Sequence, residues 1–230
     1  METIQTALKD FGLCVPIIQA QPIETQQVKP RPCVPKPLKN QFMDIARELS
    51  VRDVVINDDN RSAYSDLFNY FTNNDSRKLD KNKGVMLIGD TGVGKTLLMK
   101  SIHGLCSRCK NLELFNYLTM SNLKDLVIAS KKDDEAKNYF NSYYNSINCN
   151  DLYVDDIGTE SKEMNSYGNV SLWFEEYLME RYVLFTDYGI KLHCSTNLNS
   201  ATLKAFYSKR IIDRFNEMFN FVIMKGVSFR

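Results

Sequence analysis

Eight consecutive residues in the first half of the chain have the types and spacing needed to hold a phosphate group. Gly89-Asp90-Thr91-Gly92-Val93-Gly94-Lys95-Thr96 fits the pattern GxxxxGK[ST] in full. In such a loop the glycines let the backbone curl so that its N–H groups point at phosphate oxygens. Lys95 is expected to reach the outer phosphates of a nucleotide, and the Thr96 hydroxyl is expected to bind Mg²⁺. The pattern therefore predicts nucleotide binding.

The two elements that this loop requires flank it in the sequence. The apolar run Val85–Ile88 predicts a buried strand that leads into the loop, and Thr96–Ile102 predicts a helix that leaves it. A helix that begins at the loop adds a dipole favourable to an anion. An accidental glycine turn would not need these neighbours, so their presence favours a phosphate-binding loop.

A pair of carboxylates follows a second apolar strand. Leu152-Tyr153-Val154 predicts a short buried strand, and Asp155 and Asp156 come directly after it. The carboxyl ends of parallel strands meet at one edge of a sheet, so these carboxylates are expected beside the phosphate loop. Asp155 would hold Mg²⁺ through the ion's water shell, because Mg²⁺ keeps several waters, and Asp156 would orient and activate an attacking water. The alternative, an ordinary Asp-Asp turn, is less consistent with a position in a β-α-β pattern.

A polar amide follows the next predicted strand. Asn197 comes directly after the run Ile190–Thr196. From there its side chain could reach a terminal phosphate or the water held by Asp156. The alternative is that Asn197 caps the turn between this strand and the next helix.

Two arginines lie four residues apart in the predicted helix Lys209–Met218. This spacing places Arg210 and Arg214 on one face of the helix. They could pair with acidic neighbours such as Asp213 or Glu217. In an oligomeric ATPase, one of them would instead stabilise transition-state charge in the site of an adjacent subunit.

Helical and strand patterns alternate along the rest of the chain. Amphipathic patterns predict helices over 42–49, 61–73, 121–128, 133–145 and 172–185, and apolar runs predict strands over 112–118 and 221–224. Ser121 is expected to cap the helix over 121–128. The alternation predicts an α/β fold in which helices cover both faces of a parallel sheet.

The overall charge excludes a strong field over the whole molecule. Lys and Arg number 29 and Asp and Glu 28, which leaves a net charge of +1, so contact with nucleic acid would need a local basic patch. No apolar run approaches the length of a membrane span, and we expect no contact with a membrane. The N-terminal residues lack the basic start and long apolar run of a signal peptide, so we expect a cytoplasmic protein.

The N-terminal region differs in composition from the rest. All six prolines fall within residues 16–37, and this composition predicts an extended Pro-rich linker. Before it, Ile4, Leu8 and Phe11 share one face of a possible helix within residues 1–15. This segment is either a short docking helix or a disordered tail. Residues 38–230 then form the main domain.

Taken in order, the motifs resemble those of a known family. The set GDTGVGKT, LYVDDIG, STNLN and KRIIDRF, followed by residues 225–230, resembles the DnaC/IstB-like AAA+ ATPases over about residues 83–230. That family contains helicase loaders of bacteria and phages and helper ATPases of some transposons. The resemblance implies a P-loop NTPase with an AAA+ core that uses ATP and Mg²⁺. It also implies that Asn197 senses the terminal phosphate and that Arg214, with Arg210 as alternate, acts in a neighbouring subunit's site.

Two departures from AAA+ patterns have consequences. Most AAA+ proteins carry Glu where Asp156 stands, and the shorter side chain leads us to expect slow hydrolysis. The sequence ends at Arg230, which leaves no room for a C-terminal helical lid domain, a truncation that resembles other members of the family. Without a lid, nucleotide binding is expected to depend on self-assembly through shared ATP sites.

A region of mixed basic and aromatic residues follows the second predicted strand. In loader-type AAA+ proteins an extra helix near here meets single-stranded DNA. The residues here that suit backbone neutralisation and base stacking are Lys124, Lys131, Lys132, Lys137, Tyr139, Phe140, Tyr143 and Tyr144. The alternative is a solvated helix with a packed aromatic face, since acidic residues 133–135 interrupt the basic run.

Several functions remain open at this point. The preferred hypothesis is an ATPase that loads a replicative helicase onto DNA during replication, with the N-terminal segment docked on the helicase. An IstB-like transposition helper would instead act with a transposase on DNA. A small-molecule P-loop kinase and a nucleotide-gated binding module that hydrolyses little are further alternatives. Asn197 together with the two arginines argues against the kinase.

Overall fold

The computed structural model describes residues 37–50, 54–74, 78–130, 147, 150–159, 164–166, 169–171, 173–226 and 228. The predicted docking helix within residues 1–15, nearly all of the linker and the predicted helix over 133–145 lie outside these residues. Among the helices that are described, none combines the length and the apolar character needed to cross a membrane.

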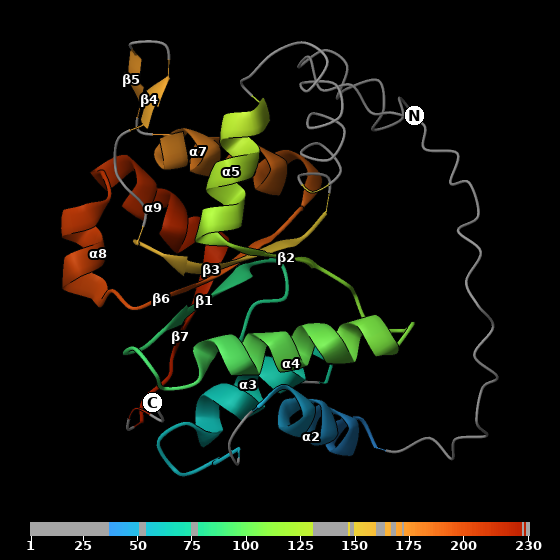
Figure 1. Ribbon diagram of the computed structural model, residues 1–230. Helices are drawn as coiled ribbons and strands as arrows, with labels where there is room; N and C mark the ends of the chain where they lie inside the picture. The colour runs from blue at the N-terminus through green and yellow to red at the C-terminus, as the bar shows by residue number, and fades with distance from the viewer. Residues whose placement is uncertain are drawn as a thin grey trace.

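Five parallel strands form the central sheet. They are β1 (Gly84–Ile88), β2 (Asn116–Thr119), β3 (Leu152–Ile157), β6 (Leu192–Thr196) and β7 (Phe219–Ile223), in the spatial order β2-β3-β6-β1-β7. β1 therefore lies between β6 and β7, and β3 lies on the other side of β6 (Figure 1). This order brings the carboxyl ends of β1, β6 and β3 side by side at one edge of the sheet.

Helices cover both faces of this sheet, as Figure 1 shows. One face carries α2 (Leu38–Leu49), α3 (Arg61–Phe71) and α4 (Lys95–Arg108), and the other carries α5 (Met120–Ser130), α7 (Trp173–Tyr188), α8 (Ser200–Phe206) and α9 (Lys209–Met218). Side chains of β1 alternate between two apolar clusters. Val85 and Leu87 pack with residues of α2, α3 and α4, and Met86 packs with residues of α5, α7 and α9. The predicted α/β architecture is confirmed.

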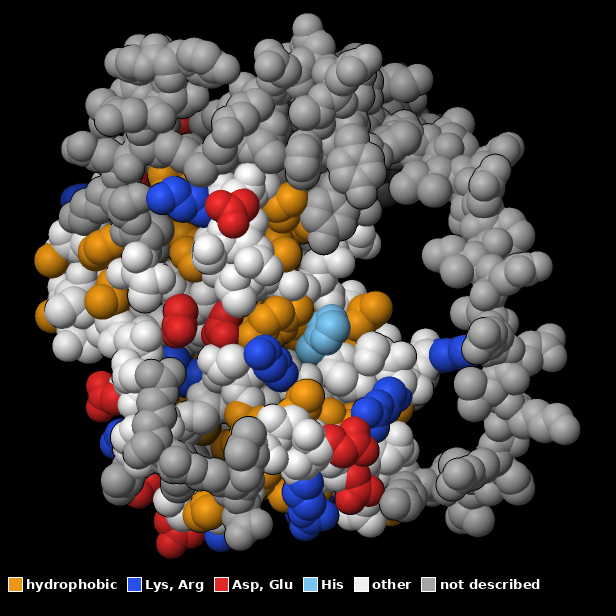
Figure 2. Space-filling model, in the orientation of Figure 1, with side chains coloured by type: hydrophobic (Ala, Val, Ile, Leu, Met, Phe, Trp, Pro, Cys, Tyr) orange, Lys and Arg blue, Asp and Glu red, His pale blue; other side chains and the backbone are white. Residues whose placement is uncertain are grey.

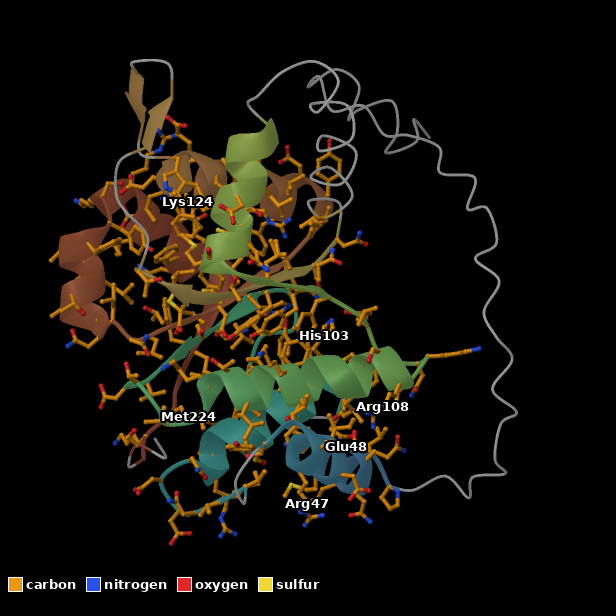
Figure 3. All side chains as sticks on the ribbon, in the orientation of Figure 1. Arg47, Glu48, His103, Arg108, Lys124 and Met224 are labelled. Carbon is orange, nitrogen blue, oxygen red and sulfur yellow. The ribbon has the colours of Figure 1, made fainter. Side chains whose placement is uncertain are left out.

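α2 and α4 are tied together at their ends as well as through the core. Arg108 near the end of α4 donates a hydrogen bond to Glu48 near the end of α2, with 2.7 Å between Nη2 and Oε2 (Figure 3). The pair is exposed, so it contributes little to stability beside the burial of Phe42 and Ile45. The contact keeps α2 alongside the helix that leaves the phosphate loop.

The structure corrects some of the predicted boundaries. β2 begins at Asn116 and not at residue 112, because the chain turns at Leu112, whose N–H donates to the Cys109 carbonyl at 3.0 Å. The cap of α5 is not Ser121, which lies inside the helix. The N–H of Asn122 donates to the Thr119 hydroxyl oxygen at 3.2 Å, so the hydroxyl at the end of β2 performs this role.

Three short elements have no counterpart in the sequence prediction. β4 (Met164–Ser166) and β5 (Asn169–Ser171) form an antiparallel hairpin outside the main sheet. α8 has seven residues, too few for a clear apolar period, and depends on its cap. The Asn199 side-chain oxygen accepts hydrogen bonds from the N–H groups of Ala201 and Thr202, each at 3.0 Å.

Candidate nucleotide-binding site

The phosphate loop joins β1 to α4 through backbone conformations that favour glycine. Gly92 and Gly94 have φ values of 89° and 99°, and Gly94 caps α4. A Cβ atom on Gly92 would lie 2.2 Å from Ser228 Oγ, and one on Gly89 would lie 2.4 Å from the carbonyl oxygen of Met224. Met224 lies beside the start of α4 (Figure 3). Residues after β7 thus pass close against the loop and leave no room for side chains at these glycines.

Lys95 is held inside the curve of the loop. Its side chain is largely buried, and Nζ donates to the carbonyl oxygens of Gly89 at 2.7 Å and Asp90 at 3.0 Å. Nζ also donates to Asn197 Oδ1 at 2.6 Å, which connects the loop to the end of β6. The ammonium group is therefore positioned where a phosphate bound in the loop would meet it.

Asn197 connects Lys95 to Asp156. While Oδ1 accepts from Lys95, Nδ2 donates to Asp156 Oδ1 at 3.2 Å. The alternative role considered for Asn197, capping the following turn, is performed by Asn199. The amide of Asn197 thus lies between a cation suited to phosphate and a carboxylate suited to orienting water.

A bulge directs the side chain of Asp156. β3 extends through Ile157, so both carboxylates lie inside the strand and not after it. The pairing of β3 with β6 changes register between Val154 and Ile157, and Asp156 has a φ of 61°. Its N–H donates to Ser195 Oγ at 3.0 Å, which holds this uncommon conformation. Bulges of this kind often re-aim a side chain beside an active site.

Asp155 accepts hydrogen bonds from four hydroxyl groups. Oδ2 accepts from Thr96 at 2.9 Å and Tyr117 at 2.8 Å, and Oδ1 accepts from Tyr153 at 2.8 Å and Ser195 at 2.6 Å. Burial raises the pKa of the Tyr117 phenol, and the Asp155 carboxylate raises it further. The same two causes, in the same order, raise the pKa of Tyr153. Both phenols therefore remain proton donors to Asp155 at neutral pH.

Sequence reasoning did not find Tyr117, Tyr153 or Ser195. Tyr153 could have been found, because it lies two residues before Asp155 in a strand and so shares its side of the sheet. Tyr117 comes from a different strand, and only the pairing of Thr119 with Asp155 places it there. Leu49 of α2 is a further residue not predicted at the site, which it helps to line.

A cavity of about 470 Å³ lies beside the phosphate loop. Its lining includes Gly92, Lys95, Thr96, Lys100, Asp156 and Asn197. The residues present fit a nucleotide with Mg²⁺: N–H groups of the loop and Lys95 suit a phosphate, the Thr96 hydroxyl can supply an oxygen ligand, and the Asp155 carboxylate, which accepts from Thr96, lies where it can hold the ion through that hydroxyl and the ion's water shell. Within the described part of the chain no three His, Cys, Asp or Glu residues cluster to hold a metal ion. Mg²⁺ needs no such cluster, since phosphates and waters complete its coordination.

The two predicted arginines lie on α9 and do not line this cavity. Arg210 is exposed, and it has no ion pair with any residue that the structure describes. Arg214 Nη1 lies 2.7 Å from Glu217 Oε1, and its guanidinium lies 4.3 Å from the centre of the Tyr182 ring. The Tyr182 hydroxyl donates to the other Glu217 oxygen at 2.6 Å. Hydrogen bonds from Tyr182 and Arg214 lower the pKa of Glu217, so it stays charged beside Arg214.

Most of the predicted DNA-contact residues lie outside the described residues. Lys131, Lys132, Lys137 and the four aromatic residues belong to that part. Lys124 is the exception: it is half-buried on α5 (Figure 3). The structure therefore leaves the basic and aromatic region as a prediction.

Comparison with solved structures identifies the fold. The chain matches a putative primosome component from Streptococcus pyogenes with a TM-score of 0.55 and 18% identity, over 84% of this chain and 99% of that one. It matches DnaI with a TM-score of 0.53 and 23% identity, over 81% and 93%. It matches AMPPCP-bound DnaA from Aquifex aeolicus with a TM-score of 0.53 and 15% identity, over 75% and 48%. No protein-family model and no curated protein matches the sequence.

These matches confirm the expected fold. The chain has the expected parallel sheet with helices on both faces, and this fold is similar to that of the primosome component and of DnaI. It spans nearly the whole of the primosome component and DnaI structures but about half the length of the DnaA structure. At these identities the likeness concerns the fold, and the function must be argued from the site.

Proposed function

We propose that this chain binds and slowly hydrolyses ATP with Mg²⁺, assembles through shared ATP sites, and loads a replicative helicase onto DNA during replication. The observation that carries the ATPase part is that Lys95, Asn197 and Asp156 are connected by hydrogen bonds and line one cavity together with Thr96, which donates to Asp155. A binding module that does not hydrolyse ATP would need Lys95 and Thr96 but not an amide that connects the cation to a second carboxylate.

Each residue of the set has a role that its position supports. N–H groups of residues 92–96 and the Lys95 ammonium would bind the phosphates, and Thr96 with Asp155 would hold Mg²⁺. The metal ion, when bound, neutralises charge that develops on the phosphates. Asp156 would accept the proton of the attacking water, and Asn197 would orient Asp156 through its Nδ2 donor. The short side chain of Asp156 is the reason to expect slow turnover.

Assembly is proposed because no arginine is among the described residues that line the cavity. Lys95 and Lys100 are the cations that line it within the described residues, whereas Arg210 and Arg214 lie on α9. An arginine from a neighbouring copy would supply the remaining positive charge at the terminal phosphate. Arg214, indicated by the family resemblance, would have to leave Glu217, and a surface ion pair of this kind is weak enough to exchange. Arg210 is already exposed and is the alternate.

The replication role rests on likeness of fold together with the motifs. The chain also matches a structure named as the DnaC helicase loader, with a TM-score of 0.50 and 19% identity, over 82% of this chain and 98% of that one. A DnaA structure that it matches contains AMPPCP and single-stranded DNA. In this proposal residues 1–15 dock on the helicase and residues 16–37 span the gap. Figure 2 shows acidic and basic side chains interspersed on the face in view. DNA contact is assigned to the region around residues 131–144 because its sequence combines lysines with aromatic residues.

The first test is phosphate release from ATP over a series of protein concentrations, with and without single-stranded DNA. Shared sites predict specific activity that rises with concentration and rises further with DNA. Lys95→Ala, which removes the cation in the loop, is the inactive control. Flat specific activity that DNA does not change would contradict shared sites, and phosphate transfer to a nucleoside in place of release would indicate the kinase.

Whether the partner protein is a helicase or a transposase is tested with the full chain. Affinity capture from cells that contain both a replicative helicase and a transposase should recover the helicase. A variant with Ile4, Leu8 and Phe11 replaced by Ser should lose it while keeping ATP binding. Recovery of the transposase would instead support the IstB-like alternative.

A further inference from the structure

Hydroxyl groups hold the Asp155 carboxylate at both of its oxygens. Four O–H groups, from Thr96, Tyr117, Tyr153 and Ser195, lie between 2.6 and 2.9 Å from them, two on each oxygen. These donors come from α4, β2, β3 and β6, so four elements fix one side chain.

The two oxygens of Asp155 have different surroundings. Oδ2 accepts one hydrogen bond from Thr96, at the end of the phosphate loop, and one from Tyr117. Oδ1 is held within the sheet by Tyr153 and Ser195, both of which are almost fully buried. Oδ2 is therefore the oxygen that contacts Thr96, the residue that would bind the metal ion, and its direction depends on the hydrogen bonds made to both oxygens.

The phenol groups are themselves fixed by packing. The rings of Tyr117 and Tyr153 lie 5.0 Å apart between centroids. The Tyr117 ring also contacts His103, which points from α4 toward the sheet (Figure 3), at 5.9 Å. Lys100, which lines the cavity, lies with Nζ 5.8 Å from the centre of the Tyr117 ring. Because these neighbours fix the Tyr117 and Tyr153 rings in position, the two hydroxyl groups can hold the carboxylate in one orientation.

We propose that Tyr117 and Tyr153 are positioning residues that orient Asp155 for Mg²⁺, so that the loss of either hydroxyl weakens metal binding more than nucleotide binding. The inference rests on the proposed function, because Asp155 is assigned to the metal there. Hydrogen-bond partners of metal-binding side chains fix the orientation of the ligand, and their loss commonly costs about 10- to 100-fold in metal affinity or activity. Neither tyrosine touches the nucleotide in this proposal.

The test compares Tyr117→Phe and Tyr153→Phe with the wild-type chain. Binding of a fluorescent ATP analogue is titrated with Mg²⁺, and Mn²⁺ binding is followed by electron paramagnetic resonance at saturating analogue. We expect the half-saturating Mg²⁺ concentration to rise by about 10-fold in each variant, while analogue affinity measured in EDTA changes less than about 2-fold.

Tyr70→Phe is the matched control. Tyr70 is also buried, and its hydroxyl donates at 2.6 Å to the Lys83 carbonyl, so this variant loses a tyrosine hydrogen bond that does not involve Asp155. Thermal unfolding of each variant identifies any that fails to fold; Tyr117 is only half-buried, so Tyr117→Phe keeps the test decisive even if Tyr153→Phe is unstable.

The outcomes separate this inference from the proposed function. If the wild-type chain shows no Mg²⁺-dependent binding of the analogue, the proposed function fails. If the wild type binds and both phenylalanine variants match Tyr70→Phe in Mg²⁺ and Mn²⁺ dependence, the positioning role fails and the ATP site stands. An equal loss of analogue affinity with and without Mg²⁺ would also overturn it, because it would show a general disturbance of the site.

Discussion

Lys95 and Asn197 are joined by a hydrogen bond of 2.6 Å, although about a hundred residues separate them in the chain. The pairing of β1 with β6 produces this contact, because Ile88 and Thr196 are partners at the ends of the two strands. Lys95 follows β1 at the end of the phosphate loop, and Asn197 follows β6 directly, so both lie at the same edge of the sheet. The phosphate loop and the end of β6 therefore act as one unit.

Removal of the Asn197 amide should affect hydrolysis more than binding. Asn197→Ala deletes the donor to Asp156 and one acceptor of Lys95, while both backbone acceptors of Lys95 remain. We expect a fall in the rate of hydrolysis of about 100-fold, with ATP affinity within about 5-fold of wild type. Single-turnover hydrolysis measures the rate, and equilibrium binding measures the ATP affinity. Asn199→Ala, which removes only the cap of α8, is the control; an equal loss of rate in that variant would contradict the role of Asn197.

Gly92→Ala should combine backbone strain with loss of nucleotide affinity. Its φ of 89° costs an L-residue about 1–2 kcal/mol, and the new Cβ would lie 2.2 Å from Ser228 Oγ. Gly189→Ala provides the comparison, since Gly189 has a φ of 68° but a Cβ added there would meet no atom within 4 Å among the residues that the structure describes. Chemical denaturation should show a loss of stability in both variants, and ATP binding should fall only in Gly92→Ala. Unchanged ATP binding there would mean that the loop tolerates a side chain.

Arg214 should act in the site of a neighbouring copy. Arg214→Ala should remove the rise of specific activity with protein concentration, and Arg210→Ala is the comparison on the same helix face. A Lys95→Ala chain keeps Arg214, and an Arg214→Ala chain keeps an intact phosphate loop. In a mixture of these two inactive variants, Arg214 of the first chain can act in the site of the second, so part of the wild-type activity should return. No recovery on mixing, in chains that still assemble, would assign Arg214 to the structure of its own subunit, where it contacts Glu217 and Tyr182.

Stability should fall on mild acidification because of His193. This side chain is almost fully buried, and its Nδ1 accepts a hydrogen bond from the Val85 N–H at 3.1 Å, which leaves Nε2 to carry the proton toward Asp151. Burial lowers its pKa below the ordinary value of 6.5, an effect that Asp151 opposes and that Lys191 and Arg181 reinforce. The unfolded chain therefore binds a proton at higher pH than the folded one. Stability is full above about pH 6.5 and declines as the pH falls below it.

The measurement is urea denaturation between pH 7.5 and 5.5. The wild type should lose more stability over this range than His193→Gln, which cannot take up a proton. His103→Gln is the control, because burial also lowers the pKa of His103 but only half of that side chain is buried. Parallel pH profiles for the wild type and His193→Gln would refute the assignment.

The parts of the candidate site that the structure brings together as expected are local in the sequence. The phosphate loop is a contiguous pattern whose chemistry requires each residue type, and its strand and helix follow from apolar periodicity. Asp155 and Asp156 were found because they follow an apolar run, although the strand continues past them to Ile157. The bulge that turns Asp156 depends on its pairing with β6, which no local pattern encodes.

What the sequence could not reveal depends on which strands become neighbours. Tyr117 reaches Asp155 only because β2 pairs with β3 in one register, and a slip of one residue would turn its side chain to the other face. Thr119 caps α5 only because β2 ends there, whereas Ser121 has the same chemistry two residues later. α8 is too short to show a period. The first two features are decided by tertiary pairing and not by propensity, whereas α8 depends on the local cap at Asn199.

The central place of β1 also sets the order in which the protein can fold during synthesis. β1 is the earliest strand of the main sheet in the sequence, yet its two partners, β6 and β7, are the latest. The apolar residues Val85–Ile88 therefore emerge from the ribosome long before either neighbour exists. At about 5–20 residues per second, that interval is on the order of ten seconds. A nascent chain of this protein needs protection of β1 by a chaperone or by α4 until the last strand has been made.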